Sequence, residues 1–298
     1  MKSVLIIGCG LIGSSLLRII AKKRISKKIF VYEKSKANIL KIKKLRLPCV
    51  ITGDFKNIVP KLDLIIFCTP MSEYEKIILR INKYLSPKTI ITDVGSSKES
   101  TLALIDKKLK KGIFWTSSHP ISGSEVSGPE FGDSNLFFNK WCILIKEKNS
   151  NKEHLIFLSK FWKKIGSKVT TMDSKKHDSV FSMTSHLPHL IAYNLVKSAQ
   201  DFEKQKKYDL IKYSAGGLRD FSRIAASNEI MWRDIFFNNQ SNISKVIDLF
   251  IKNLKSFKKD IKSKNNKSII KKLVETKKVR KKIIKLKQDI NKPDFGRL

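Results

Sequence analysis

Short aliphatic runs alternate with helix-like segments through the first half of the chain. The runs are apolar at nearly every position, as is typical of strands that are buried on both faces. They lie at residues 3–8, 28–33, 62–69 and 89–95, with a weaker run at 50–52 and further ones at 113–118, 141–146 and 168–172. Apolar residues recur at helical spacing over residues 13–24, 36–45 and 72–85. This alternation predicts βαβ units and a parallel sheet.

The pattern changes after about Ser174, where the strand-like runs stop. Long helical patterns then cover residues 178–204, 208–215, 228–238 and 242–262. The lysine-rich tract at 255–287 is interleaved with Ile and Leu, as on an amphipathic helix. Gly216 and Gly217 predict a turn within this half. We therefore expect an α/β nucleotide-binding domain over residues 1–172, followed by an all-helical domain over residues 173–298.

The 298-residue chain carries a formal charge of +35. Such a charge is typical of a protein that binds nucleic acid or a membrane surface, but it also arises where lysine is simply the commonest surface residue. The lysines are spread along the whole chain, which favours the second interpretation and no specific nucleic-acid partner. The basic C-terminal tract still leaves an acidic partner open. No run approaches the ~18 apolar residues of a membrane span. The apolar run before Cys9 is also too short for a signal peptide, so we expect a cytoplasmic protein.

A glycine-rich run, Gly8-Cys9-Gly10-Leu11-Ile12-Gly13, directly follows the first strand and opens an apolar helix. In this context the first glycine makes a tight turn, the second lets the backbone approach a pyrophosphate, and the third allows close packing of helix on strand. The unpaired N–H groups of a helix start, here those at Leu11 and Ile12, favour negative charge. The motif therefore predicts a Rossmann-type dinucleotide site.

Glu33 ends the second strand 20 residues after Gly13. An acidic residue at this distance bonds the ribose hydroxyls of NAD and repels the 2′-phosphate of NADP. NAD is therefore the expected cofactor. The alternative is that Glu33 is a solvated charge at a strand end, beside Lys34.

Two polar motifs follow later strands, at the sheet edge where open α/β folds bind their ligands. In the first, DVGSSK, Ser96 is expected to face the nicotinamide, or else to cap the helix that starts near Lys98. In the second, SSHPISGSE, His119 is followed by Pro120 and small residues that leave room for a ligand. Because an imidazole accepts protons near neutral pH, His119 is a candidate general base.

The helical half contains two further groups of candidate residues. In SHLPH, His186 and His189 are three residues apart, but no third ligand stands nearby and Pro188 favours a kink, so we expect no metal. One or both imidazoles are expected to face the cleft. The blocks GLRDFSRIA and MWRD supply Arg219, Arg223 and Arg233, which suit carboxylate binding, or pairing with a neighbouring Asp.

Taken together, these motifs resemble the prephenate dehydrogenase family, and most of all its cyclohexadienyl type, which accepts both prephenate and arogenate. The resemblance rests on GCGLIGSS, DVGSSK, SSHPISGSEVSGPE, MTSHLPHLIAY, SAGGLRDFSRIAASNEIMWRDI and the terminal PDFGR. It runs in order from about residue 4 to residue 240, and again at the C-terminus. The SHLPH block, followed by the block that runs from the glycines through the arginines to MWRD, is highly specific, whereas other Rossmann dehydrogenases with helical second domains share only the first motif.

The resemblance implies NAD-dependent oxidative decarboxylation of prephenate, arogenate or both in tyrosine biosynthesis, and a homodimer formed through the helical domain. It matches Ser96 to the serine that hydrogen-bonds the catalytic histidine and the nicotinamide region. It matches His119 to the histidine that takes the ring hydroxyl proton. His189 matches a histidine that contacts the substrate side chain, and Arg223 an arginine that holds a substrate carboxylate. Ser124 and Ser185, in the same motifs, are expected to bind substrate.

The sequence also leaves two less favoured functions open. One is another Rossmann dehydrogenase with a helical domain, acting on a small hydroxy acid or imino acid. The other is a basic protein associated with nucleic acid. Turnover with prephenate or arogenate would separate the expected enzyme from both.

Overall fold

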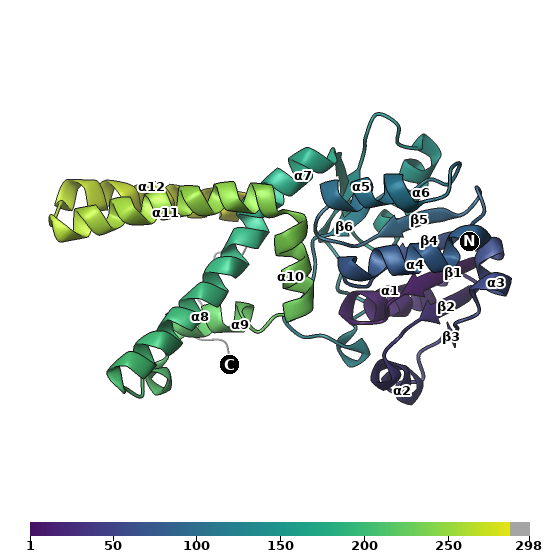
Figure 1. Ribbon diagram of the computed structural model, residues 1–298, viewed down its shortest axis with the longest axis horizontal. Helices are drawn as coiled ribbons and strands as arrows, with labels where there is room; N and C mark the ends of the chain where they lie inside the picture. The colour runs from purple at the N-terminus through teal and green to yellow at the C-terminus, as the bar shows by residue number, and fades with distance from the viewer. Residues whose placement is uncertain (287–298) are drawn as a thin grey trace.

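The computed structural model describes residues 1–286. Its main sheet has five parallel strands in the order β3-β2-β1-β4-β5 (Figure 1). They are β1 Ser3–Ile7, β2 Lys28–Tyr32, β3 Val50–Ile51, β4 Leu64–Phe67 and β5 Ile90–Asp93. This is the strand order of a doubly wound nucleotide-binding sheet, 3-2-1-4-5-6, through its fifth strand. The expected α/β fold with a parallel sheet is confirmed.

Each face of the sheet packs against its own helices, which explains the continuous apolar runs. Val4 and Ile6 of β1 join a buried cluster with helix α1 (Leu11–Lys22) and helix α6 (Lys152–Lys164). Leu5 and Ile7 point to the other face, where they join α4 (Tyr74–Ile81) and α5 (Glu99–Lys108). Because successive side chains of a strand alternate between faces, both sets must be apolar. Ile42 of helix α2 (Lys36–Lys44) joins the first cluster, and Phe55 of helix α3 (Phe55–Ile58) joins the second.

A second sheet continues the domain with the order β6-β7-β8, comprising Ser118–Pro120, Trp141–Ile145 and Lys168–Met172. Strand β7 pairs antiparallel with β6 and parallel with β8. The prediction of a strand over residues 113–118 was wrong. Residues 113–117 pair with β5 only at a bridge between Ile91 and Trp115, where the Thr116 N–H donates to the Ile91 carbonyl. It then leaves β5 and pairs with β7 from Ser118 onward.

The remainder of the described chain is helical. Its elements are α7 Ser174–Phe181, a π-helical turn Ser182–His186, α8 Leu187–Lys206, α9 Gly216–Ile224, α10 Glu229–Asn238, α11 Gln240–Lys262 and α12 Asn266–Lys285. In Figure 1, α11 and α12 lie side by side and extend away from the sheets. Trp232 and Ile235 of α10 pack into the cluster on the α4 face, which joins this half to the main sheet.

Three expectations for the helical half were wrong. The expected helix at 208–215 is reduced to a short 3-10 turn at Ile211–Tyr213. Gly216 and Gly217 are not a turn, since α9 begins there, where a helix start tolerates glycine. The tract at 255–287 is not one helix, because the chain turns back at 263–265. There Lys264 has a φ of +50° and the Asn265 side chain caps α12 by accepting from the Ser268 N–H. Residue 287 and the PDFGR motif lie outside the described residues.

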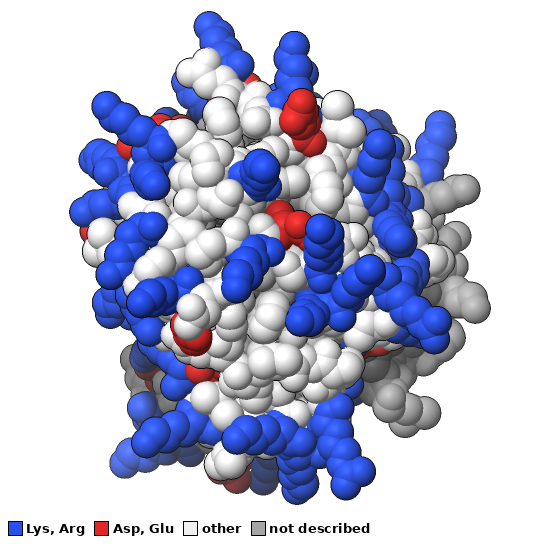
Figure 2. All heavy atoms as spheres, turned by 90° about the vertical axis from the view of Figure 1, so that its right-hand side faces the viewer, with Lys and Arg blue, Asp and Glu red and all other residues white. Residues whose placement is uncertain are grey.

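Lys and Arg side chains are spread around the face shown in Figure 2 and do not form one compact patch. That face belongs to the nucleotide-binding half, seen from the right-hand side of Figure 1. Within residues 1–286, no helix combines the length and the apolar character that crossing a membrane requires.

Candidate active site

The glycine-rich loop between β1 and α1 has the shape that a dinucleotide requires. Gly8 has a φ of +89°, and a Cβ there would lie 2.7 Å from Thr69 Cγ2. A Cβ on Gly13 would lie 2.0 Å from the Gly8 carbonyl oxygen, so helix and turn approach too closely for any other residue. A Cβ on Gly10 would meet nothing within 4 Å, and α1 begins at the next residue. The loop thus offers open space at a helix N-terminus, which fits a pyrophosphate.

Glu33 is fixed against this loop and is not a free surface charge. Its carboxylate accepts from the Cys9 N–H at 2.9 Å and from the Ser35 N–H at 2.9 Å. The neighbouring Lys34 points elsewhere and pairs with Glu73 at 2.9 Å. The carboxylate therefore lies beside the loop, directly after β2, where a ribose would be bound.

Ser96 lies in the segment that links β5 to α5, and it does not cap the helix. Helix α5 begins at Glu99, its N-cap position is Lys98, and that cap has no side-chain hydrogen bond. Lys98 itself is fully buried, with Nζ 2.7 Å from Asp93 Oδ2 and 2.8 Å from the Ser118 carbonyl oxygen. This buried ion pair ties the end of β5 to β6 and so fixes the segment that carries Ser96.

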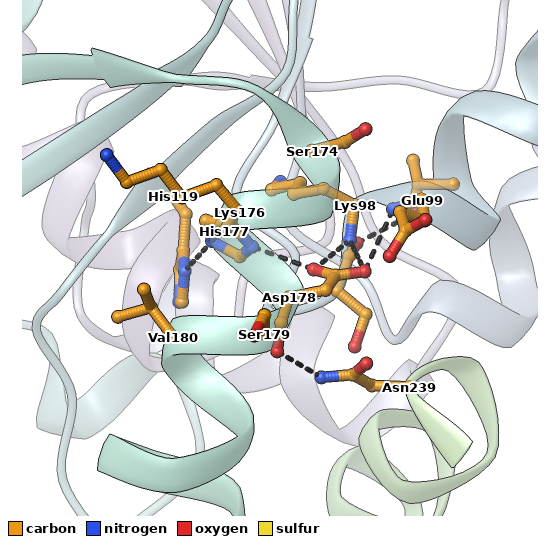
Figure 3. Close-up of polar contacts among 12 residues, drawn as sticks. Lys98, Glu99, His119, Ser174, Lys176, His177, Asp178, Ser179, Val180 and Asn239 are labelled. Carbon is orange, nitrogen blue, oxygen red and sulfur yellow. Dashed lines mark hydrogen bonds and ion pairs between the residues drawn. The ribbon is translucent and has the colours of Figure 1, made fainter. Parts of the chain in front are cut away.

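His119 lies on β6 and is the first member of a hydrogen-bonded chain. Its Nδ1 is 2.8 Å from His177 Nε2, and His177 Nδ1 is 2.7 Å from Asp178 Oδ1 (Figure 3). Among the described residues, the hydrogen-bond partner of the His119 ring is thus His177, and not Ser96 as the family resemblance implied. Burial, and then the neighbouring His177, hold the pKa of His119 well below its usual range, so the ring is neutral near pH 7.

The two histidines of the SHLPH motif lie in different surroundings. His186 is fully buried, its Nδ1 lies 3.1 Å from Asn239 Nδ2, and burial lowers its pKa to about 4. His189 is half-buried and stacks on Trp232, with ring centroids 3.8 Å apart. Its Nδ1 donates to the Ser185 carbonyl at 2.9 Å, which leaves Nε2 for another partner. Of the two, His189 is therefore the one available to a ligand.

The three arginines also separate into different environments. Arg233 pairs with the buried Asp234 at 2.6 Å, so it belongs to a structural contact. Arg219 is exposed on α9. Arg223 pairs with Glu125 Oε2 at 3.3 Å, and Ser124 Oγ donates to that same oxygen at 2.9 Å. This contact joins α9 to the loop after β6, which carries His119.

Sequence reasoning missed His177, Asp178 and Asn239, although all three are buried and connect to candidate residues. One signal for the first two was an adjacent His-Asp pair four residues after Asp173, which caps α7. Asn239 carries no local signal, because its contacts to Asp178 and His186 form only in the folded chain. Within residues 1–286, no group of three or more His, Cys, Asp or Glu side chains is arranged to hold a metal.

These features indicate a dehydrogenase: a dinucleotide-binding sheet, a glycine loop with a fixed acidic partner, and a histidine on β6 that is bonded to His177 of the helical half. The chain belongs to the prephenate dehydrogenase family. The nucleotide-binding domain of prephenate dehydrogenase matches residues 17–171, and the prephenate dehydrogenase dimerization domain matches residues 173–276. The family resemblance of the sequence is thereby confirmed.

Similar proteins cover nearly the whole chain. It is 32% identical to a cyclohexadienyl dehydrogenase of Zymomonas mobilis over 279 residues, which are 94% of this chain and 95% of that protein. It is 30% identical to a prephenate dehydrogenase of Bacillus subtilis, over 85% of this chain and 68% of that one. Prephenate dehydrogenase from Aquifex aeolicus, solved in complex with hydroxyphenyl propionate and NAD+, superposes with a TM-score of 0.88 at 32% identity and covers 95% of this chain and 98% of that one.

Proposed function

We propose that this protein catalyses the NAD-dependent oxidative decarboxylation of prephenate, arogenate or both, as a step of tyrosine biosynthesis. The products are 4-hydroxyphenylpyruvate and tyrosine, respectively. The observation that carries the proposal is the position of His119 in a family of dehydrogenases. It is a neutral imidazole on β6, and its neighbour Ser118 donates to the Asp93 carbonyl at the carboxyl end of β5 at 2.7 Å.

The substrate ring is a cyclohexadienol with a carboxylate opposite its hydroxyl group. NAD, when bound, accepts the hydride from the carbon that carries the hydroxyl. His119 Nε2 takes the hydroxyl proton, because Nδ1 is already bonded to His177. The C–CO2 bond then breaks, its electron pair enters the ring, and the ring becomes aromatic as CO2 leaves. The ring oxygen takes back a proton, which gives the phenol of the product and restores the neutral His119.

The remaining residues bind and orient. Gly8, Gly10, Leu11, Ile12 and Gly13 cradle the pyrophosphate, and Glu33 bonds the ribose and disfavours NADP. Ser96 lies at the nicotinamide end of the site.

On the substrate side, Arg223 holds a carboxylate. To do so, its exposed guanidinium must either release Glu125 or bind both carboxylates. His189, Ser185 and Ser124 line the same space. Their support is the half-buried, stacked ring of His189 and the contact of Ser124 with the partner of Arg223.

We further propose that the protein is a cytoplasmic homodimer, with residues 1–172 as the nucleotide-binding domain and 173–298 as the substrate-binding and dimerisation domain. The last described strand ends at Met172, and helices follow it. Exposed apolar side chains on α11 and α12 support an interface there, among them Leu254 and Leu273.

The test is reduction of NAD by the purified protein with prephenate and with arogenate. His119→Asn keeps a polar side chain of similar reach but removes the base, so kcat should fall by about 10²–10⁴-fold. The KM for NAD should stay unchanged, because the glycine loop and Glu33 are untouched. Since burial lowers the pKa of His119, wild-type activity should persist below pH 6.5 before it falls on the acid side.

The matched control is His154→Asn, on α6 and outside the site, which should keep the wild-type kcat. No turnover of either substrate by folded wild-type protein contradicts the proposed function. Full activity in His119→Asn contradicts the assignment of the base.

A further inference from the structure

Two residues that the proposed reaction does not use directly lie behind His119. The rings of His119 and His177 are 5.0 Å apart between centroids, and Phe181 packs against both. Asp178 stands behind His177, on the same helix α7. All three polar side chains are buried, so their hydrogen bonds are not shared with bulk water.

Asp178 must act as an acceptor on both of its oxygens. Its Oδ1 accepts the Lys98 N–H at 2.8 Å, and its Oδ2 accepts the Glu99 N–H at 2.9 Å. These N–H groups begin helix α5 and cannot accept in return. Each oxygen of the Asp178 carboxylate is therefore occupied as an acceptor.

The direction of every proton in the chain follows from that carboxylate. Asp178 accepts, so His177 Nδ1 carries the hydrogen between them. Burial lowers the pKa of His177, so its ring is neutral and its Nε2 has only a lone pair. His119 Nδ1 must then be the donor in the 2.8 Å contact. His119 Nε2 is left without a hydrogen, as a base requires.

We propose that His177 and Asp178 are positioning residues that hold His119 in its Nδ1–H tautomer and stabilise its cation after it takes a proton. This rests on the proposed role of His119 as the base. The arrangement follows the logic of a triad, in which a carboxylate orients an imidazole, with a second imidazole inserted between them.

The hydrogen-bonded chain from His119 through His177 to Asp178, here called the relay, is fixed by contacts from three elements, which keeps the ring of His119 in one orientation. Helix α7 carries His177 and Asp178, the start of α5 bonds the Asp178 carboxylate, and Asn239 Nδ2 donates to the Asp178 carbonyl at 2.8 Å (Figure 3). The other ionisable groups near His119 are Lys98, neutralised by Asp93, and the neutral His186. Asp178 is therefore the carboxylate that connects to His119 through hydrogen bonds.

The decisive variant is Asp178→Asn. The Lys98 N–H also lies 3.1 Å from Oδ2, so an amide oxygen at that position accepts both N–H groups of α5. The NH2 group then faces His177 and becomes a donor. His177 then donates from Nε2, and His119 must place its hydrogen on Nε2, the wrong nitrogen. We expect kcat to fall by about 10²-fold or more, with the KM for NAD unchanged. Asp173→Asn, the exposed cap of the same helix, is the matched control and should keep kcat.

A second pair of variants guards against misfolding. The amide oxygen of His177→Gln accepts from His119 Nδ1–H and preserves the tautomer, whereas His177→Leu offers no acceptor. The glutamine variant should therefore retain about tenfold more kcat than the leucine variant. Equal losses in these two variants would mean that the second imidazole only fills space.

The tautomer is read directly by ¹⁵N NMR of protein labelled in its five histidines, with His119→Asn assigning the signal. His119 should be protonated at Nδ1 in the wild type and at Nε2 in Asp178→Asn. An unchanged tautomer with unchanged kcat overturns the proposal. If the wild type turns over neither substrate, the proposed function fails, while the NMR result still decides the relay.

Discussion

The two halves of the molecule bury their apolar side chains in different ways. In the nucleotide-binding half, every residue of β1 is buried, and two clusters fill both faces of the main sheet. In the helical half, α9 and α12 contain no buried residue, and α11 buries only Ile243 and Asp260. The first half is stabilised by its own packing. The second presents apolar surface that residues 1–286 of a single chain do not cover, which is typical of an obligate interface.

The largest effect should come from breaking the buried ion pair of the nucleotide-binding half. Lys98→Met leaves the Asp93 carboxylate buried without its partner, which typically costs about 3–5 kcal/mol. Urea unfolding at fixed protein concentration measures this loss of unfolding free energy. The matched control is Lys108→Met, whose pair with Glu75 is exposed and should matter by less than about 1 kcal/mol. Equal costs would show that the interior of this half is not what stabilises it.

A smaller effect is expected at the surface of the helical half. Leu254 on α11 is 57% exposed, and Leu79 on α4 is 59% exposed, so they form a matched pair of leucines. Leu254→Asp should weaken self-association by about 2 kcal/mol, or roughly 30-fold, because it places a charge in an apolar interface. Leu79→Asp should leave it unchanged. Sedimentation equilibrium measures the self-association of both variants. A monomeric wild type would contradict the idea that the helical half forms an interface.

The smallest effect is expected at the nucleotide loop, where the backbone provides most of the binding. Glu33→Gln should reduce the preference for NAD over NADP by about tenfold, since the 2′-phosphate no longer meets a carboxylate. The ratio of kcat/KM for the two cofactors measures this. An unchanged ratio would mean that Glu33 serves only to hold the Cys9 N–H.

The main sheet and its glycine loop were predictable because their signals are local. A run such as residues 3–7 is apolar on both faces only in a covered parallel strand, and Gly8 and Gly13 meet steric limits that other residues cannot satisfy. Helix α6 was missed for the opposite reason. It is required by the parallel pairing of β7 with β8, and periodicity does not reveal how two strands pair.

In the candidate site, the sequence indicated which residue types carry chemistry but not their partners. His119 stood out because of its strand end and its small neighbours. His177 did not, because its role depends on a contact across 58 positions. For Arg233, likewise, the sequence left open whether it binds a ligand or a neighbouring Asp, and its pair with the buried Asp234 appears only in the folded chain.

The π-helical turn between α7 and α8 lets this segment hold one residue more than a regular helix without turning α8. The Leu187 N–H donates to the Ser182 carbonyl five residues back, so the turn holds one residue more than an α-helical turn. Because the extra residue is taken up within the turn, loss of one residue from 182–186 would give a regular helix with α8 close to its present orientation. His189 would keep its stacking on Trp232. The exposed Met183 and Thr184 are therefore positions where the chain can change length without losing the site.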